Sequence, residues 1–283
     1  MGNPQNNMLT KKIWMYWGQG WDQAPHLVTQ CKNSWARLNP DFELYLLDDK
    51  TLFDYIDFPK AIDIKRRDLT IQKISALARL ALLSKYGGVW ADGTTMCTQP
   101  LSEWLEQYYG CEFFAFRNPG KDRLMANWFI AAEPGSVILQ RLNKHFTDFY
   151  VKNHFSNMGT AIGEKMIQYF GRRWNVDARS SLMWHDWFVR KVLRIYPYFI
   201  FHYTFNKLIL EDVECARMWN ETKALSAETP HKVQYLENRR DNVNEAKRVI
   251  DSGISPVHKL NWRVNSSNNY WSAVLPYFEK FNS

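Results

Sequence analysis

The residues of this chain whose types and spacing favour chemistry begin in an apolar run from 74 to 83. Arg79 is the only charged residue of that run, and Ser75 lies four residues before it. The run has the length of a helix, so Ser75 and Arg79 share one face of the predicted helix. Because a buried charge is costly unless it is used, we expect Arg79 to contact a phosphate or a sugar. The alternative is an arginine that snorkels to solvent or pairs with a core carboxylate.

A carboxylate follows the next predicted element. The glycine pair at 87–88 ends the helix, since glycine supplies the positive φ that reverses the chain, and 89–91 is a short apolar strand. Asp92 and Thr94 therefore lie beyond the carboxyl end of a strand, where open α/β sheets bind their ligands. A carboxylate beside a hydroxyl at this position suits a divalent cation that carries a diphosphate. Asp92 could equally cap a following helix.

The elements that would position these residues alternate between strand and helix. The order β-α-β-α-β from residue 13 to 92 predicts an α/β fold with a doubly wound, mostly parallel sheet. Beyond residue 155 helical segments dominate, which predicts a helical C-terminal elaboration. The predicted strands are 13–17, 42–47, 89–91, 113–116 and 127–132, and the predicted helices include 27–38, 74–83 and 137–150.

Further candidates follow the first two predicted strands, in loops that a nucleotide could contact. Tyr16, Trp17 and Gly18 end the first strand and open its loop, where a base or ribose can lie against backbone and aromatic rings. Ordinary core packing is the alternative for both rings. Asp48 and Asp49 follow the second strand. Either carboxylate could hold a ribose or base, or cap the helix that starts near residue 50, a role that we favour for Asp49.

The run SALARLALLSKYGGVWADGT at 75–94 resembles the core signature of the capsular-polysaccharide-synthesis glycosyltransferases. These are bacterial relatives of the DXD-sugar-binding transferases, which include the initiating mannosyltransferases of yeast. The spacing Ser-x3-Arg-x6-Tyr-Gly-Gly-x3-Asp is similar, more distantly, to that of the large clostridial glucosylating toxins. Segments 13–20, 127–132 and 258–263 are also similar to family segments, so the resemblance spans roughly residues 11 to 263.

The resemblance implies a GT-A-like glycosyltransferase that moves a hexose from a nucleotide-sugar donor, with UDP as the favoured nucleotide, to a growing capsular or O-antigen-type glycan. Retention of the anomeric configuration is implied by the family alone. Mn²⁺ or Mg²⁺ would hold the donor diphosphate through Asp92 and the late His258, and Lys259 would neutralise the leaving group. A surface His-Lys pair is the alternative. Asn127 would hydrogen-bond the donor sugar, unless it is a turn asparagine.

The candidate site therefore combines three sets of residues. The catalytic candidates are Asp92, Arg79 and Asn127, and the metal-binding candidates are Asp92 and His258. The donor-binding candidates are Tyr16, Trp17, Gly18, Asp48, Ser75, Arg79, Gly88, Thr94 and Lys259.

Three positions depart from the family pattern. Ala76 stands where relatives often have an acidic residue. Pro197 stands before the aromatic pair at 198–199, where relatives often have a second acidic residue. The triplet at 92–94 supplies one carboxylate where many relatives have two. On the simplest arrangement this single carboxylate leaves the predicted metal site one ligand short. The three departures together also support an alternative function, that of a catalytically weakened glycan-binding or scaffold subunit with a GT-A fold.

The charge of the chain bounds its partners. The 283 residues include 36 Lys and Arg against 29 Asp and Glu, a formal net charge of +7. Such a charge favours nucleic acid, an anionic membrane face or anionic ligands. The basic pairs at 11–12, 66–67, 172–173 and 239–240 are dispersed, and no nucleic-acid motif accompanies them. We therefore predict a nucleotide-sugar donor, a lipid-linked or oligosaccharide acceptor and peripheral contact with an anionic membrane, but no nucleic acid.

Cysteine usage and hydropathy bear on location. The four cysteines are widely spaced and show no metal-binding pattern, which predicts free thiols in a reducing compartment. No apolar run has the length of a membrane span, and the first twelve residues do not resemble a signal peptide. We expect a cytoplasmic protein that is peripheral at the inner face of the plasma membrane.

The length suits one sizeable core. We expect a single GT-A-like domain over 11–265, with a nucleotide-sugar-binding α/β core at 11–150 and a helical acceptor-side part at 151–265. Residues 1–10 and 266–283 are expected to be tails.

Overall fold

The computed structural model describes residues 9–59, 62, 69–237, 239, 242–261, 263 and 269–281. In this part of the chain a five-stranded sheet has the order β2-β1-β3-β6-β5, and a second sheet pairs β4 with β7. The strands are β1 Lys12–Tyr16, β2 Glu43–Leu47, β3 Gly88–Ala91, β4 Thr95–Cys97, β5 Phe113–Gly120, β6 Arg123–Ala132 and β7 Val257–Lys259.

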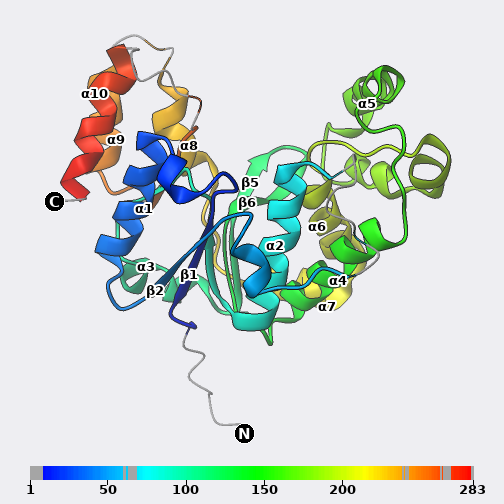
Figure 1. Ribbon diagram of the computed structural model, residues 1–283, viewed down its shortest axis with the longest axis horizontal. Helices are drawn as coiled ribbons and strands as arrows, with labels where there is room; N and C mark the ends of the chain where they lie inside the picture. The colour runs from blue at the N-terminus through cyan, green and yellow to red at the C-terminus, as the bar shows by residue number, and fades with distance from the viewer. Residues whose placement is uncertain are drawn as a thin grey trace, which may run out of the picture.

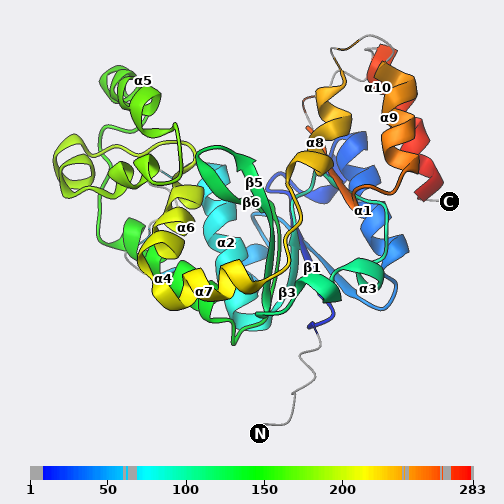
Figure 2. The same ribbon diagram turned by 180° about the vertical axis from the view of Figure 1, so that it is seen from behind.

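Helices cover both faces of the large sheet. In Figures 1 and 2, α2, α4, α6 and α7 lie on one side of it, and α1, α3 and α8 to α10 lie on the other. The α-helices are α1 His26–Leu38, α2 Ile71–Tyr86, α3 Leu101–Trp104, α4 Val137–Val151, α5 Ala161–Trp174, α6 Ile200–Glu211, α7 Val213–Glu221, α8 Glu228–Tyr235, α9 Asn242–Asp251 and α10 Asn269–Phe278. The shorter helical segments are η1 Trp21–Gln23, η2 Leu52–Asp54, η3 Glu106–Tyr108, η4 Ser180–His185, the π-helical η5 Val189–Leu193 and η6 Glu279–Phe281.

The strand directions confirm the predicted α/β class. β2, β1 and β3 pair in parallel, while β6 runs antiparallel to both β3 and β5. All strands of the large sheet except β6 therefore point the same way, as expected of a GT-A-like, mostly parallel sheet. The β5–β6 hairpin was not predicted. β5 continues to Gly120, beyond the predicted end of this strand at residue 116, and Asn118 within it adopts a positive φ of 55°.

Alternation along β1 explains how the sheet is held between its helical layers. Trp14 and Tyr16 pack with residues of α2, α4 and α6 in one core cluster. Ile13 and Met15 pack on the opposite face with residues of α1 and α3. Successive strand residues point to opposite faces, so an unbroken apolar strand is typical of a sheet that is buried on both sides.

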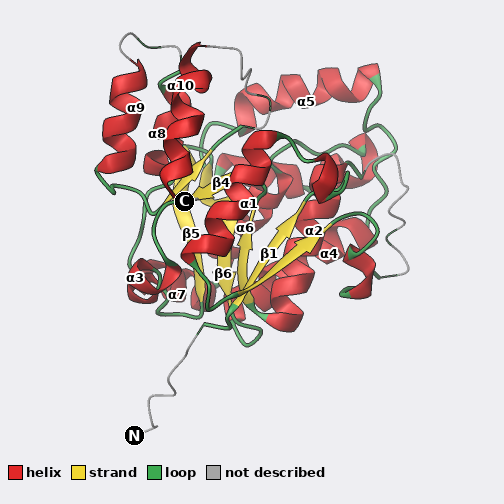
Figure 3. Ribbon diagram, turned by 60° about the vertical axis from the view of Figure 1, so that its left-hand side comes forward, coloured by secondary structure: helices red, strands yellow, loops and turns green. Residues whose placement is uncertain are grey.

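A third core cluster joins the C-terminal helices to α1 and β4. Figure 3 shows α8, α9 and α10 grouped beside α1. The expected tail at 266–283 is wrong over 269–281, because these residues form α10 and η6 and bury Trp271 completely. Parts of three other expected features lie outside the described residues. These parts are residues 1–8 of the N-terminal tail, the basic pair at 66–67, and residue 240 of the basic pair at 239–240.

Two sequence expectations concern thiols and membrane spans. All four cysteines are free, and Cys31, Cys97 and Cys215 are buried. Among the described residues, no helix combines the length and apolar character that crossing a bilayer requires.

Candidate active site

The candidate site lies at the edge of the large sheet where β1, β2 and β3 end. Because these strands are parallel, the residues that follow them gather along one edge. Trp17 follows β1, and Asp92 and Gly93 follow β3. A Cβ atom on Gly93 would lie 3.2 Å from Cε3 of Trp17, so glycine at this position allows the indole to lie directly against the loop that carries Asp92.

Asp92 is held by three donors. Its Oδ1 accepts hydrogen bonds from Nη2 of Arg79 at 3.0 Å and from Nε1 of Trp90 at 2.8 Å. Its Oδ2 lies 3.3 Å from Nζ of Lys259. Burial opposes ionisation, but the charges of Lys259 and Arg79 and the Trp90 hydrogen bond hold the pKa of Asp92 below its ordinary value. Asp92 is therefore a carboxylate that orients two cations.

Arg79 projects from α2 into the space above Trp90. Arg79 is only 3% exposed. Its Cζ lies 5.0 Å from the ring centroid of Trp90 and 5.5 Å from that of Phe201. Its Nη2 lies 3.4 Å from Oγ of Ser75. Its Nε and Nη1 are buried without hydrogen-bond partners among the described residues. A buried donor without an acceptor is costly, so these two groups point to an anionic or hydroxyl-rich ligand.

Lys259 reaches the same place from the other end of the sequence. β7 pairs with β4, with Lys259 opposite Thr95. This pairing places Nζ of Lys259 2.5 Å from Oγ1 of Thr94 as well as beside Asp92. Lys259 thus lies beside Asp92, from which it is separated by 167 positions in sequence, and its contact with a donor diphosphate stays a prediction.

Lys73 is a further site residue that the sequence analysis did not identify. It lies in the first turn of α2, is 5% exposed, and donates a hydrogen bond to the carbonyl of Tyr198. Burial, together with the charge of Arg79, lowers its pKa to about 7. No carboxylate of the described residues pairs with it. We refer to Lys73, Arg79 and Lys259 as the cationic cluster. Among the described residues, Asp92 is the carboxylate that pairs with this cluster, through Arg79 and Lys259.

His202 and Arg123 border this cluster on α6 and β6. Burial lowers the pKa of His202 far below its ordinary value, and the charges of Arg123, Arg79 and Lys73 act in the same direction. Arg123 is paired with Asp122 at 3.1 Å. His202 is thus a neutral histidine that packs beside the rings of Phe199 and Phe201.

The predicted metal site is not supported. Both oxygens of Asp92 face cations or an indole N–H, so a divalent ion would have to displace Arg79 or Lys259. In the described ranges no group of three or more His, Cys, Asp or Glu side chains is close enough to hold a metal. The donor set therefore does not fit Mn²⁺ or Mg²⁺, which prefer several oxygen ligands.

His258 is the clearest correction among the metal candidates. It alternates with Lys259 along β7, so the two side chains point to opposite faces. The imidazole is completely buried, its ring centroid is 5.6 Å from that of Phe278, and neither ring nitrogen has a partner among the described residues. Burial lowers the pKa of His258 to about 4. His258 is a neutral core residue, and it does not face Asp92 as a shared metal site would require.

The carboxylate after β2 that acts as a cap is Asp48 and not Asp49, for which we favoured that role. Oδ1 of Asp48 accepts from the backbone N–H groups of Lys50 and Thr51, each at 2.9 Å, so Asp48 caps the turn that leads into η2. Asp49 instead accepts a hydrogen bond from the hydroxyl of Tyr16. Gly18 lies beside this pair, since a Cβ on it would approach the Tyr16 hydroxyl to 3.0 Å. Donor binding by Tyr16, Gly18 and Asp48 stays a prediction.

Gly88 and Asn127 complete the candidate list. Gly88 begins β3, at the opposite end of that strand from Asp92, and a Cβ on it would lie 2.4 Å from the carbonyl oxygen of Lys12. A side chain does not fit here because β1 passes so close. Since Gly88 lies at the end of β3 that is remote from Asp92, its predicted contact with the donor is wrong. Asn127 precedes Trp128, whose carbonyl accepts from the backbone N–H of Asp92 at 2.8 Å. Asn127 therefore lies at the right edge, but its contact with a sugar stays a prediction.

Comparison with known families identifies one match that extends over most of the chain. The sequence profile of the family described as "Capsular polysaccharide synthesis protein" matches residues 2–158 and 180–277. These ranges include every residue of the cationic cluster as well as Asp92 and Thr94.

A curated protein and two solved structures show weaker similarity. An O-glycosyltransferase, braB, of Annulohypoxylon truncatum is 29% identical over 150 residues, which cover 46% of this chain and 35% of that protein. The chain thus matches little more than a third of that relative. The structure titled PaToxG glycosyltransferase has a TM-score of 0.40 at 11% identity, covering 97% of this chain and 87% of its own. The catalytic domain of the α-toxin of Clostridium novyi has a TM-score of 0.35 at 11% identity, covering 99% and 75%.

Proposed function

Because this chain belongs to the capsular polysaccharide synthesis family, we propose that it is a glycosyltransferase that takes its sugar from a nucleotide-sugar donor. The observation that carries the proposal is the buried guanidinium of Arg79, which keeps two N–H groups without partners among the described residues. A diphosphate supplies the acceptor oxygens and negative charge that this environment lacks. The relative named as an O-glycosyltransferase supports the same reaction class.

The cationic cluster would act on the leaving group. When the bond between the sugar and the diphosphate breaks, negative charge develops on the diphosphate. Arg79 and Lys259, both held by Asp92, would stabilise that charge with donors that are already in place before the reaction. Lys73 would add a further positive charge once the diphosphate raises its lowered pKa. Asp92 acts in this scheme as the positioning residue that fixes Arg79 and Lys259.

The finer features of the proposal come from the family. We infer a hexose as the transferred sugar, UDP as the nucleotide, and a capsular or O-antigen-type glycan on a lipid carrier as the acceptor, with retention of configuration. Asn127, from the sheet edge, and Ser75, from α2, would contact sugar hydroxyls or phosphate oxygens. A location at the inner face of the plasma membrane would give access to such an acceptor.

A panel of UDP- and GDP-sugars tests the proposal, with release of the nucleoside diphosphate as the readout. The wild-type protein should release nucleoside diphosphate from at least one donor, and Arg79→Ala should lose that release. Arg217→Ala, on the exposed face of α7, is the matched control and should retain it. If the protein binds glycans but hydrolyses no donor, the alternative of a weakened glycan-binding subunit replaces the proposal.

A further inference from the structure

A surface on the opposite side of the sheet from α8 to α10 combines exposed aromatic side chains with unpaired cations. The segment 187–194 has the sequence WFVRKVLR. Val189 is buried and anchors the segment in the core, whereas Trp187 and Phe188 are 63% and 50% exposed. Val192 is also exposed, one helical turn after Phe188. Large exposed apolar side chains that adjoin one another are uncommon on a soluble surface and indicate a binding face.

The cations of this segment have no carboxylate partners among the described residues. Nε of Arg190 donates to the carbonyl of His185 at 2.8 Å, and Nε of Arg194 to the carbonyl of Lys191 at 3.3 Å. Lys191 donates to the carbonyl of Lys152 at the end of α4. Carbonyl acceptors orient these side chains but leave their charges uncompensated.

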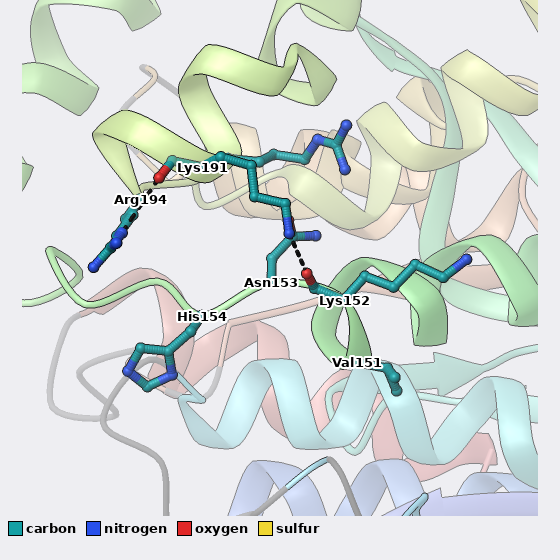
Figure 4. Close-up of a pocket in the computed structure, with 7 residues that line it drawn as sticks. Val151, Lys152, Asn153, His154, Lys191 and Arg194 are labelled. Carbon is teal, nitrogen blue, oxygen red and sulfur yellow. Dashed lines mark hydrogen bonds between the residues drawn. The ribbon is translucent and has the colours of Figure 1, made fainter.

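These side chains surround an open pocket of about 490 Å³. Figure 4 shows Lys152, His154, Lys191 and Arg194 around it, with Lys191 directed at the Lys152 carbonyl. Two carboxylates lie near this surface, and both are engaged. Asp148 pairs with Lys144 and Lys152, and Asp186 accepts from the backbone N–H of Phe188 at 2.7 Å. Four cations, Lys152, Arg190, Lys191 and Arg194, outnumber these two carboxylates, so this surface is positive overall. We call the surface formed by Lys152, Trp187, Phe188, Arg190, Lys191, Val192 and Arg194 the basic-aromatic surface.

We propose that the basic-aromatic surface docks the protein on an anionic lipid bilayer. A soluble anion would use the cations alone, but a bilayer interface offers both anionic head groups and an apolar boundary for Trp187, Phe188 and Val192. Tryptophan is enriched at the level of the head groups because its ring is apolar and its N–H is polar. The combination of both kinds of side chain in one eight-residue segment thus favours a membrane over a free phosphate or an acidic polysaccharide.

The chain connects this surface to the candidate site over a short distance. Tyr198 follows Arg194 by four residues, which span at most about 14 Å of extended chain. The carbonyl of Tyr198 accepts the hydrogen bond from Lys73 of the cationic cluster. A bilayer at the basic-aromatic surface would therefore lie close to the site, although the docking itself does not depend on the proposed transferase activity.

Vesicle cosedimentation at low salt tests the proposal with the full-length protein. The probes are vesicles of phosphatidylcholine alone and vesicles in which part of it is replaced by phosphatidylglycerol. Wild-type protein should bind the anionic vesicles and not the neutral ones, and added salt should weaken binding. The triple variant Arg190→Gln, Lys191→Gln, Arg194→Gln should partition about a hundredfold more weakly, given the usual contribution of each cation near an anionic surface.

Two further variants complete the design. Trp187→Ala with Phe188→Ala removes the apolar contribution and should also weaken binding, and both side chains are exposed enough to be replaced without loss of the fold. The matched control is Lys50→Gln, Arg217→Gln, Arg248→Gln, which removes the same charge from exposed positions on other elements and should bind nearly as well as wild type. The proposal is overturned if wild type ignores anionic vesicles, if both triple variants bind alike, or if wild type instead binds a soluble acidic polysaccharide through these residues.

Discussion

Arg79 shows how a single side chain can define a site. Its burial at 3% exposure is costly for a charge, and the contacts with Asp92, Trp90 and Phe201 compensate for part of that cost. The remaining donors, Nε and Nη1, are the groups that a ligand would satisfy. The helix places them there because Arg79 lies on the face of α2 that meets the carboxyl end of β3.

Arg79→Lys retains the charge but removes the planar fork of donors. We expect nucleoside diphosphate to bind about ten- to a hundredfold more weakly to this variant, as is typical when charged hydrogen bonds are lost. Titration calorimetry measures the change, and a circular dichroism spectrum like that of wild type excludes unfolding as its cause. Arg217→Lys on α7 is the control, and equal affinity in wild type and Arg79→Lys would contradict the assigned role.

The buried imidazole of His258 should make the free energy of unfolding fall in acid. Its pKa is about 4 in the folded protein, below the ordinary value near 6.5, so the unfolded chain binds more protons between these values. Stability that is fully present above pH 6.5 is therefore lost as the pH falls toward 4, by about 3 kcal/mol from this residue. His258→Leu should flatten the decline of the free energy of unfolding over that range, as measured by urea denaturation. A variant with the same pH dependence as wild type would show that His258 is not buried in its neutral form.

At the scale of elements, β7 decides the geometry of the site. This short strand carries Lys259 to Asp92 and directs His258 into the core, and it is held by pairing with β4 and by the cluster that includes α10. The position of Lys259 thus depends on packed C-terminal structure. The burial of Val257 and Leu260 shows that the segment that carries Lys259 is packed into the fold.

Trp271 of α10 tests that dependence. Because its side chain is completely buried, Trp271→Ala should lower the free energy of unfolding by about 3–5 kcal/mol in urea denaturation. Trp187→Ala, at a position that is 63% exposed, should change it by less than about 0.5 kcal/mol. Similar small effects for both tryptophans would mean that α10 contributes little to the fold.

Local patterns explain which elements and residues could be predicted. The helix that ends at the glycine pair, the strand after it and Asp92 follow from apolar length and glycine chemistry, and the structure confirms them. Lys73 could not be identified, because a lysine in the first turn of a helix is usually exposed and only tertiary packing against Tyr198 buries it. His258 and Lys259 are adjacent, and the sequence does not show which of two alternating side chains faces the site. The helix α10 could have been found from its apolar spacing at residues 270, 271, 274, 275 and 278.

In the whole molecule, positive charge is concentrated in two regions for which we propose anionic ligands. The net charge of +7 is not a uniform property of the surface. The cationic cluster concentrates it at the sheet edge beside Asp92, and the basic-aromatic surface presents it to solvent. Tyr198, whose carbonyl accepts a hydrogen bond from Lys73 of the cationic cluster, lies four positions after Arg194 of the basic-aromatic surface. This closeness suits a protein that takes a soluble anionic donor and works at an anionic bilayer.

The same charge arrangement bears on metal dependence. Arg79 and Lys259 already neutralise Asp92. We therefore propose that these two side chains supply the positive charge that a divalent cation would otherwise bring to the diphosphate. Binding of a nucleoside diphosphate should consequently persist in the presence of EDTA.

A calorimetric titration of UDP, and separately of GDP, into wild-type protein and Lys259→Met in buffer that contains EDTA shows whether the cationic cluster binds a diphosphate without a metal ion. We expect wild type to bind at least one of the two nucleotides in EDTA, and Lys259→Met to bind it at least about tenfold more weakly because one charge-assisted contact is lost. The proposed role of the cluster would be contradicted if wild type bound neither nucleotide without added Mn²⁺, or if Lys259→Met bound as tightly as wild type.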